Sequence, residues 1–190
     1  MSSSYRMELD RWISQLDVKA DRVLDIGGSQ LPAKGRTKSW DVGEYLIADI
    51  PEPHVDSPKP DIEIDLNNPS WDHDSPYCNI QLLFCLEVFD YIWNPSAAMH
   101  YIYRCLTYGG TAWVTFPFVY PTHNPIEDDM LRYTEFAVRK LAEVSGLKIE
   151  EIIPRRPETN AIENLWRAER MRAAKHYDHN VTGWIVRFTK

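Results

Sequence analysis

The 190-residue chain has the length of one folded domain, and 44% hydrophobic with 12% aromatic residues is the composition of a globular protein with a sizeable core. Its formal charge of -7, from 28 acidic residues against 21 Lys and Arg, excludes a broad electrostatic attraction to nucleic acid or to anionic lipid. No segment approaches the roughly 20 consecutive apolar residues of a membrane span, and the charged N-terminus lacks the apolar centre of a secretion signal. We therefore expect a single domain over residues 1–190 in the cytoplasm, with neither a membrane nor nucleic acid as partner.

The first elements are a short helix and four apolar runs. Apolar residues at helical spacing predict a helix near residues 5–16, within an N-terminal segment, residues 1–20, that lies against the body. Runs rich in Val, Ile and Leu follow at residues 22–27, 44–50, 61–66 and 80–88, and they are typical of strands buried on both faces of a parallel sheet. Each run ends in or near an acidic residue, which predicts several carboxylates along one edge of the sheet.

The connections between the early runs leave little room for crossover helices. Pro32 and Gly35 follow the first run, where a helix would normally start. Four prolines within ten residues separate the second run from the third: Pro51, Pro53, Pro58 and Pro60. Because proline lacks a backbone donor and clashes with the preceding helical turn, we expect loops here and a thinly covered sheet face. The N-terminal helix, a basic helix near the C-terminus or the second subunit of a homodimer could cover that face.

The second half alternates regularly between helices and strands. The predicted elements are a helix over 94–110, a strand over 110–118, a helix over 134–146, a strand over 147–154, a helix over 160–177 and a final strand over 183–190. Pro95 and Thr134 start the first two helices, and Gly109 and Gly146 end them. This alternation predicts one open α/β sheet whose last strand runs antiparallel. Ligands of such sheets bind beyond the carboxyl ends of the strands, at the switch point in the strand order.

Five motifs in this order resemble the class I S-adenosylmethionine-dependent methyltransferases, in particular their small-molecule, "methyltransferase type 11"-like group. The motifs are VLDIGG (23–28), LIADI (46–50), IEIDL (62–66), LLFCLEVFDYIWNP (82–95) and CLTYGGTAWVTFPFVYPTHNPIEDDMLRYT (105–134). The resemblance covers most of residues 20–150. It implies a Rossmann-like class I methyltransferase fold with a seven-stranded, mostly parallel sheet, here with reduced early crossover helices. It also implies S-adenosyl-L-methionine as cofactor and S-adenosyl-L-homocysteine as product.

Carried over residue by residue, the resemblance implies a cofactor site built from the strand ends. The loop from Asp25 to Ser29 would hold the methionine part of the cofactor, and Asp49 would accept hydrogen bonds from the ribose hydroxyls. Asp65 and Leu66 would lie at the adenine. A carboxylate accepts two hydroxyl hydrogen bonds at once, and such charge-assisted bonds are strong. The remaining members of the implied cofactor site are Gly27, Gly28, Ile50, Leu86 and Glu87.

The polar loop after residue 118 holds the predicted catalytic residues. His123 is the candidate general base because its unperturbed pKa lies near neutrality. Asp128 or Asp129 could orient it or bind the acceptor, and Arg132 completes the predicted set; the alternative is that His123 and Arg132 brace the loop. The fourth motif lacks the signatures of enzymes that methylate DNA or protein amino groups or the cytosine ring. We therefore expect a small-molecule acceptor with a hydroxyl, carboxyl or amine group.

A basic segment and a histidine-rich turn lie near the C-terminus. Residues 155–180 form a basic helical insertion that concentrates six cations: Arg155, Arg156, Arg167, Arg170, Arg172 and Lys175. This segment is either a lid that faces the acceptor or a surface helix whose arginines pair with nearby glutamates. The turn with His176, Asp178 and His179 is typical of a solvated loop, so we predict no metal site.

Two other functions fit parts of the sequence. A pseudoenzyme that binds the adenosyl cofactor and regulates or assembles with another protein would account for departures from the family pattern. Ser29 stands where an alternate glycine is expected, and Asp90 with Tyr91 stands where the family has Glu-His. A nicotinamide-dependent oxidoreductase is disfavoured, because DIGGSQLP (25–32) lacks the glycine spacing and the following helix that a pyrophosphate needs.

Overall fold

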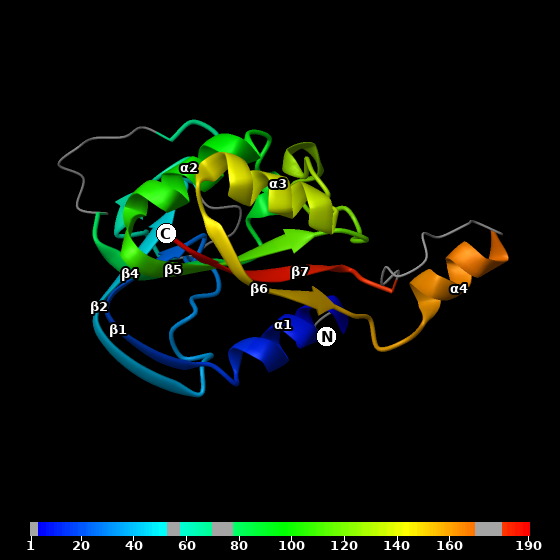
Figure 1. Cartoon of the computed structure of the whole chain (residues 1–190), viewed down its shortest axis with the longest axis horizontal. Coiled ribbons are helices and arrows are strands. Elements are labelled where there is room, and N and C mark those ends of the chain that lie inside the picture. The colour runs from blue at the N-terminus through cyan, green and yellow to red at the C-terminus, as the bar shows by residue number, and fades with distance from the viewer. Residues whose placement is uncertain (1–3, 53–57, 70–77, 170–179) are drawn as a thin grey trace.

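A seven-stranded sheet in the order β3-β2-β1-β4-β5-β7-β6 is the frame of the protein (Figure 1). The structure is a computed structural model that describes residues 4–52, 58–69, 78–169 and 180–190. The strands are β1 (Asp17–Ile26), β2 (Ser39–Asp49), β3 (Ile62–Glu63), β4 (Ile80–Cys85), β5 (Leu106–Pro117), β6 (Lys148–Arg155) and β7 (Gly183–Thr189). This sheet confirms the predicted α/β fold and places each predicted strand, although β3 is only two residues long.

The chain direction sets where the strand ends lie. β1 pairs in parallel with β2 and β4, β2 with β3, and β4 with β5, whereas β7 runs antiparallel to both β5 and β6. The carboxyl ends of the five parallel strands therefore meet at one edge of the sheet. The strand order reverses between β1 and β4, and a ligand of such a sheet binds above that point.

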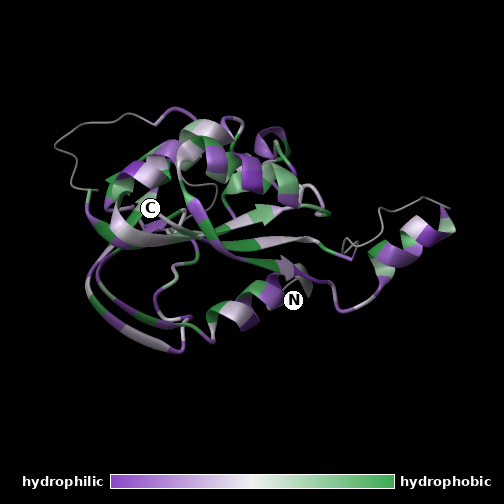
Figure 2. Ribbon diagram, viewed as in Figure 1, coloured by the Kyte–Doolittle hydropathy of each residue, from purple (hydrophilic) through white to green (hydrophobic). Residues whose placement is uncertain are grey.

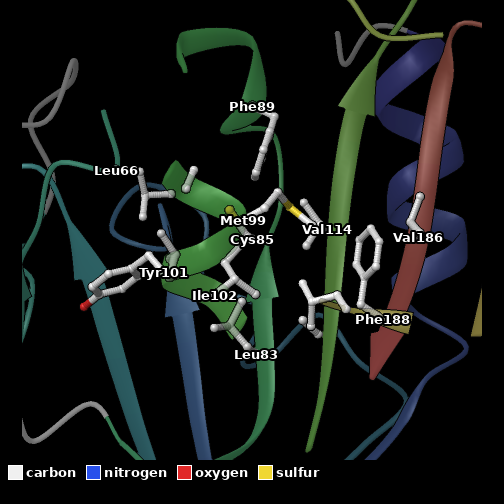
Figure 3. Packing of buried hydrophobic residues seen from close by; sticks show 14 of the residues in the cluster. Leu66, Leu83, Cys85, Phe89, Met99, Tyr101, Ile102, Val114, Val186 and Phe188 are labelled. Atoms are coloured by element: carbon white, nitrogen blue, oxygen red, sulfur yellow. The ribbon is translucent and has the colours of Figure 1, made fainter. Parts of the chain in front are cut away.

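The larger core lies between the sheet and the helices α2 (Pro95–Cys105) and α3 (Glu135–Ser145), which share one face (Figure 1). Figure 3 shows Met99 and Ile102 of α2 packed above Leu83, Cys85 and Val114, all of which are fully buried. The predicted helix signals are confirmed for α3. Thr134 accepts a hydrogen bond from the Ala137 amide at 3.2 Å, and Gly146 ends the helix in the left-handed region at φ 80°.

The opposite face is covered by α1 (Ser4–Ile13) and by loops (Figure 1). Residues 27–38, which join β1 to β2, contain turns but no helix, and no helix occurs among the described residues between β1 and β4. This confirms the predicted loss of the early crossover helices. Leu9 and Ile13 of α1 are buried, and Trp12 packs edge-on against Trp113 of β5 at 4.7 Å between ring centroids. α1 and the loop after β1 therefore cover this face of the sheet where crossover helices would otherwise lie.

The prediction of a helix over 94–110 was wrong at its C-terminal end. α2 ends at Cys105 and β5 starts directly at Leu106, which is buried and pairs with Ile80 of β4. Gly109 and Gly110 exchange backbone hydrogen bonds with Lys190, so they extend the strand instead of ending the helix. Glycine disfavours both helices and strands, so the sequence alone does not assign these two residues. Their backbone hydrogen bonds with Lys190 place them in the strand.

The basic insertion is shorter than predicted, because Arg155 is the last residue of β6 and only 2% exposed. Its described helix is α4 (Ala161–Ala168), where Arg167 pairs with Glu163 at 2.5 Å. α4 stands away from the sheet in Figure 1, and polar and apolar residues alternate along it in Figure 2. The predicted residues Arg170, Arg172, Lys175, His176, Asp178 and His179 lie outside the described residues. Within the described ranges, no helix is both long and apolar enough to cross a membrane.

If α1 is the cover of its sheet face, truncating its buried side should be costly. Ile13→Ala removes a side chain that is 1% exposed, and we expect a loss of about 2 to 4 kcal/mol in the free energy of unfolding. Arg11→Ala on the exposed side of the same helix should change it by less than about 0.5 kcal/mol. Urea unfolding followed by circular dichroism measures both, and equal effects of the two substitutions would contradict the packing described here.

Candidate active site

A cavity of about 980 Å³ opens at the carboxyl edge of the parallel strands. Its walls come from the ends of β1 and β2, from residues 64–67 after β3 and from residues 86–88 after β4. The loop after β5 closes the far side, and α1 contributes Arg6 and Leu9. The cavity thus lies where the reversal of the strand order predicts a ligand site.

The turn after β1 brings backbone close to the cavity. Gly27 lies at φ 77°, and its amide donates to the carbonyl oxygen of Ala48 at 2.7 Å. A Cβ on Gly27 would lie 2.3 Å from Cγ2 of Val88, and a Cβ on Gly28 would lie 2.8 Å from the Asp25 carboxylate. Both positions therefore require glycine, and Gly27 lines the cavity with bare backbone.

Asp25 faces away from the cavity and holds the loop that replaces the first crossover helix. Its Oδ2 accepts hydrogen bonds from the Ala33 amide and from the Tyr45 hydroxyl, both at 2.6 Å. The residue is 2% exposed, and burial raises the pKa of its carboxyl to about 6. Of the predicted cofactor residues, Asp25, Gly28 and Ser29 do not line the cavity.

Asp49, at the end of β2, does line the cavity and joins two strand ends. Its Oδ2 accepts a hydrogen bond from the Ser29 amide at 3.1 Å, and its Oδ1 accepts one from the Ile50 amide at 2.9 Å. These two bonds fix the carboxylate, while each oxygen retains a further acceptor position. Asp49 and Ile50 are thus placed together with Gly27, as the resemblance implies.

The segment after β3 is tied to the segment after β4. The Asp65 carboxylate accepts a hydrogen bond from the Asn67 backbone amide at 2.8 Å. The Asn67 side chain donates to the Tyr91 carbonyl oxygen at 3.1 Å and accepts from the Trp93 amide at 2.8 Å. Asp65 and Leu66 line the cavity next to this bridge. Asn67 was not predicted, and a lone asparagine after a short strand offers no signal for it in the sequence.

Glu87, which is partly exposed, pairs with the buried Arg155 at the cavity wall. The residue lies at φ 58°, and its carboxylate accepts from Arg155 at 2.5 and 3.3 Å, from Thr115 at 3.0 Å and from Tyr120 at 3.2 Å. Burial raises the pKa of Glu87, but the Arg155 guanidinium and these hydrogen bonds lower it further, so the net pKa lies below its usual value. Glu87 and Leu86 both line the cavity, and the Glu87 carboxylate is neutralised by Arg155.

His123 and Asp90 form a dyad on the far wall. His123 Nδ1 lies 3.1 Å from Asp90 Oδ2, and its ring packs edge-on against Tyr120 at 4.6 Å between centroids. The hydrogen bond to Asp90 raises the pKa of His123 above its usual value, against burial, which lowers it. Because Nδ1 bonds the carboxylate, neutral His123 presents an acceptor at Nε2.

Arg132 has a bracing position in the loop. Its guanidinium pairs with Asp129 and donates to the carbonyl oxygens of Tyr120 and Pro121, both at 3.2 Å. Asp129 in turn accepts the His123 amide at 2.7 Å. Of the three predicted catalytic residues, His123 and Asp128 line the cavity and Arg132 does not, whereas Asp90, which was not predicted, does.

Solved structures share the fold of this chain at low sequence identity. No family model matches the sequence, and no curated protein matches it. Among solved structures, an S-adenosylmethionine-dependent methyltransferase from Mesorhizobium loti has a TM-score of 0.62 at 13% identity, over 98% of both chains. A complex of the Haloferax volcanii Trm112 methyltransferase activator with a methyltransferase matches with a TM-score of 0.62 at 17% identity, over 98% of this chain and 92% of that one. The [4+2]-cyclase SpnF matches with a TM-score of 0.59 at 16% identity, over 98% and 80%.

These likenesses show the fold: the chain has the architecture of the class I S-adenosylmethionine-dependent methyltransferases. The seven-stranded sheet with its antiparallel β5-β7-β6 end agrees with that architecture. The cyclase among the matches has the same fold, so the reaction has to be argued from the site.

The raised pKa of Asp25 predicts a pH-dependent stability. Because folding raises it from 3.8 to about 6, the protonated carboxyl stabilises the fold below pH 3.8, and that contribution is lost as the pH rises through 6. In Asp25→Asn this titration is absent, so the free energy of unfolding of the wild type should fall relative to the variant by about 3 kcal/mol over this range. Urea unfolding at several pH values measures the difference, with exposed Asp21→Asn as control. Parallel curves for wild type and Asp25→Asn would contradict the buried position of Asp25.

Because Glu87 and Arg155 interact directly, the effects of substituting them on the free energy of unfolding should not be additive. Arg155→Met leaves the partly buried Glu87 carboxylate without its cation and should lower the free energy of unfolding by about 2 kcal/mol. Adding Glu87→Gln should restore most of that loss, because an uncharged pair has no such desolvation cost. Chemical unfolding of the two single variants and the double variant measures the coupling, and additive losses would refute a direct pair.

Proposed function

We propose that the protein transfers a methyl group from S-adenosyl-L-methionine to a small-molecule acceptor with a hydroxyl, carboxyl or amine group. The proposal rests on the position of Asp49. Its carboxylate is held by two hydrogen bonds at the end of β2, and it lines the cavity together with the bare backbone of Gly27, where the strand order reverses. The class I methyltransferase fold supports the same reading.

The residues present fit the cofactor. Gly27 lies at φ 77°, which L side chains rarely adopt, and it lines the cavity, so a ligand can approach the backbone there. The acceptor positions on Asp49 suit a ribose diol, and Asp65 with Leu66 would hold the adenine. When bound, the cofactor supplies a methyl group on a sulfonium, whose transfer requires an aligned nucleophile.

The chain would contribute a base and an enclosed site. His123 would take the acceptor proton at Nε2, while Asp90 holds the ring and stabilises the imidazolium. Asp128, from the same loop, would orient the acceptor. Arg132 and Asp129 would keep the loop in place and so act as positioning residues.

Cofactor binding is tested by calorimetry with S-adenosyl-L-homocysteine. We expect Asp49→Ala to weaken binding by about tenfold or more, because two charge-assisted hydrogen bonds are lost. Asp41→Ala, an exposed acid on the same strand, is the matched control and should bind as the wild type does. Binding of NAD in place of the adenosyl ligand would refute the proposal.

The base predicts a pH profile. The rate at limiting cofactor and acceptor should rise with pH through the pKa of His123, which lies above its usual value because of Asp90. Asp90→Asn removes the charge that raises this pKa, so the rising limb should move to lower pH. Initial rates from pH 5.5 to about 9 measure the shift. A limb that stays in place would show that another group is the base.

A binding protein that regulates or assembles with another protein is the alternative, and the Haloferax volcanii match, a methyltransferase in complex with an activator, supports a protein partner for this chain. In that case the adenosyl ligands would bind and Asp49→Ala would weaken their binding, but a broad acceptor screen would give no product. Restored turnover on addition of a partner protein would then assign the chain to a catalytic complex.

A further inference from the structure

Asp90 carries a buried carboxylate oxygen that has no donor among the described residues. The Asp90 side chain is 5% exposed, its Oδ2 bonds His123, and its Oδ1 has no hydrogen-bond partner in the part of the chain that the structure describes. Leaving a buried charged oxygen unbonded costs free energy, and in native proteins such a group calls for an explanation. Because Asp90 also lines the cavity, a small rotation of its carboxylate would let a donor carried by a ligand satisfy this oxygen.

The charges at this end of the cavity favour a cationic ligand. Glu87 is neutralised by Arg155, and Asp129 is neutralised by Arg132. Asp128 also lines the cavity and has no ion pair among the described residues. The arginines in the cavity wall, Arg6 and Arg36, lie on α1 and on the loop after β1, and Arg36 pairs with Asp10 at 2.8 Å. A carboxylate acceptor would be repelled at the dyad, whereas an ammonium group would be attracted.

The remaining walls are aromatic and apolar. Tyr91, Trp93 and Tyr120 line the cavity, and aromatic faces attract cations within about 6 Å of the ring. Trp93 is 61% exposed and Met130, also in the wall, is 47% exposed. Large apolar side chains at the rim of a pocket favour a ligand with an apolar body.

From these three observations we infer that the acceptor is an amine on an apolar or aromatic body, with its ammonium group bound by Asp90 and Asp128 next to His123. This inference rests on the proposed methyl transfer. The ammonium gives one proton to Nε2 of neutral His123, and the freed lone pair then forms the N–C bond as the S–C bond breaks. The electrons of the broken bond stay on sulfur as a thioether. The product leaves as a methylammonium, and His123 releases its proton to water.

Three probes that differ only in the head group test the inference: phenethylamine, 2-phenylethanol and phenylacetate. Each is titrated calorimetrically into the full chain, with and without saturating S-adenosyl-L-homocysteine, and each is incubated with S-adenosyl-L-methionine for mass analysis. We expect phenethylamine to bind about tenfold more tightly than the alcohol, and the carboxylate to bind least. We also expect N-methylphenethylamine to be the main product.

Three variants separate the site from general electrostatics. Asp90→Asn and Asp128→Asn should each weaken the binding of phenethylamine by about tenfold and weaken the binding of the alcohol by much less. Glu127→Gln, next to Asp128 but outside the cavity wall, is the matched control and should bind both probes as the wild type does. If the alcohol or the carboxylate binds as well as the amine, or if neither Asp variant weakens the amine, the inference is wrong.

The same titrations distinguish this failure from failure of the proposed function. Binding of S-adenosyl-L-homocysteine with no preference for the amine overturns only the acceptor class. Preference for the amine through Asp90 and Asp128, without binding of the adenosyl ligand, overturns the methyl transfer and leaves the cation site standing.

Discussion

The ion pair between Glu87 and Arg155 connects the two halves of the sheet at the cavity. Arg155 ends β6 at the sheet edge, and β7 and β5 lie between it and the end of β4, so only a long side chain can reach Glu87. Arg155 is buried and Glu87 is partly buried, so the pair costs desolvation free energy, which is offset only when the remaining hydrogen bonds are made. Here Thr115 and Tyr120 make them, and Tyr120 in turn packs against His123.

The loss of the early crossover helices has shaped the same edge of the sheet from the other side. A loop without a helix cannot offer a helix N-terminus to a phosphate, so a dinucleotide would find no partner there. The loop is held instead by the buried Asp25, and it leaves Gly27 and Asp49 at the cavity. A ligand with a ribose and an amino-acid moiety, but without phosphate, fits this arrangement, which is why the missing helix favours the adenosyl cofactor.

Much of the frame was predictable because its causes are local. Apolar runs that end in acids define the parallel strands, and Thr134 with Gly146 marks the ends of α3 through hydrogen bonds within a few residues. Asp25 and Asp49 show the limit of such reasoning, because both end apolar runs and nothing in the local sequence tells which of the two carboxylates faces the cavity. One is buried under a tyrosine hydroxyl and the other faces the cavity, and that difference depends on the path of residues 27–38.

The cavity wall near His123 was less predictable because it is assembled from distant segments. Arg155 pairs with a residue 68 positions earlier, and in the sequence it reads as one of several cations in a basic insertion. Asp90 reads as a departure from the family pattern, yet it is the partner of His123. Charge and spacing along the chain cannot reveal either contact, since both depend on strand order and on the loop after β5.

The central claim is that the cavity holds an adenosyl cofactor between Asp49 and the dyad of His123 and Asp90. A crystal structure of the chain with S-adenosyl-L-homocysteine tests it most directly. The account predicts that both ribose hydroxyls bond the Asp49 carboxylate and that the sulfur faces the wall formed by His123 and Asp90. A ligand bound outside this cavity, or one whose sulfur points away from that wall, would contradict it.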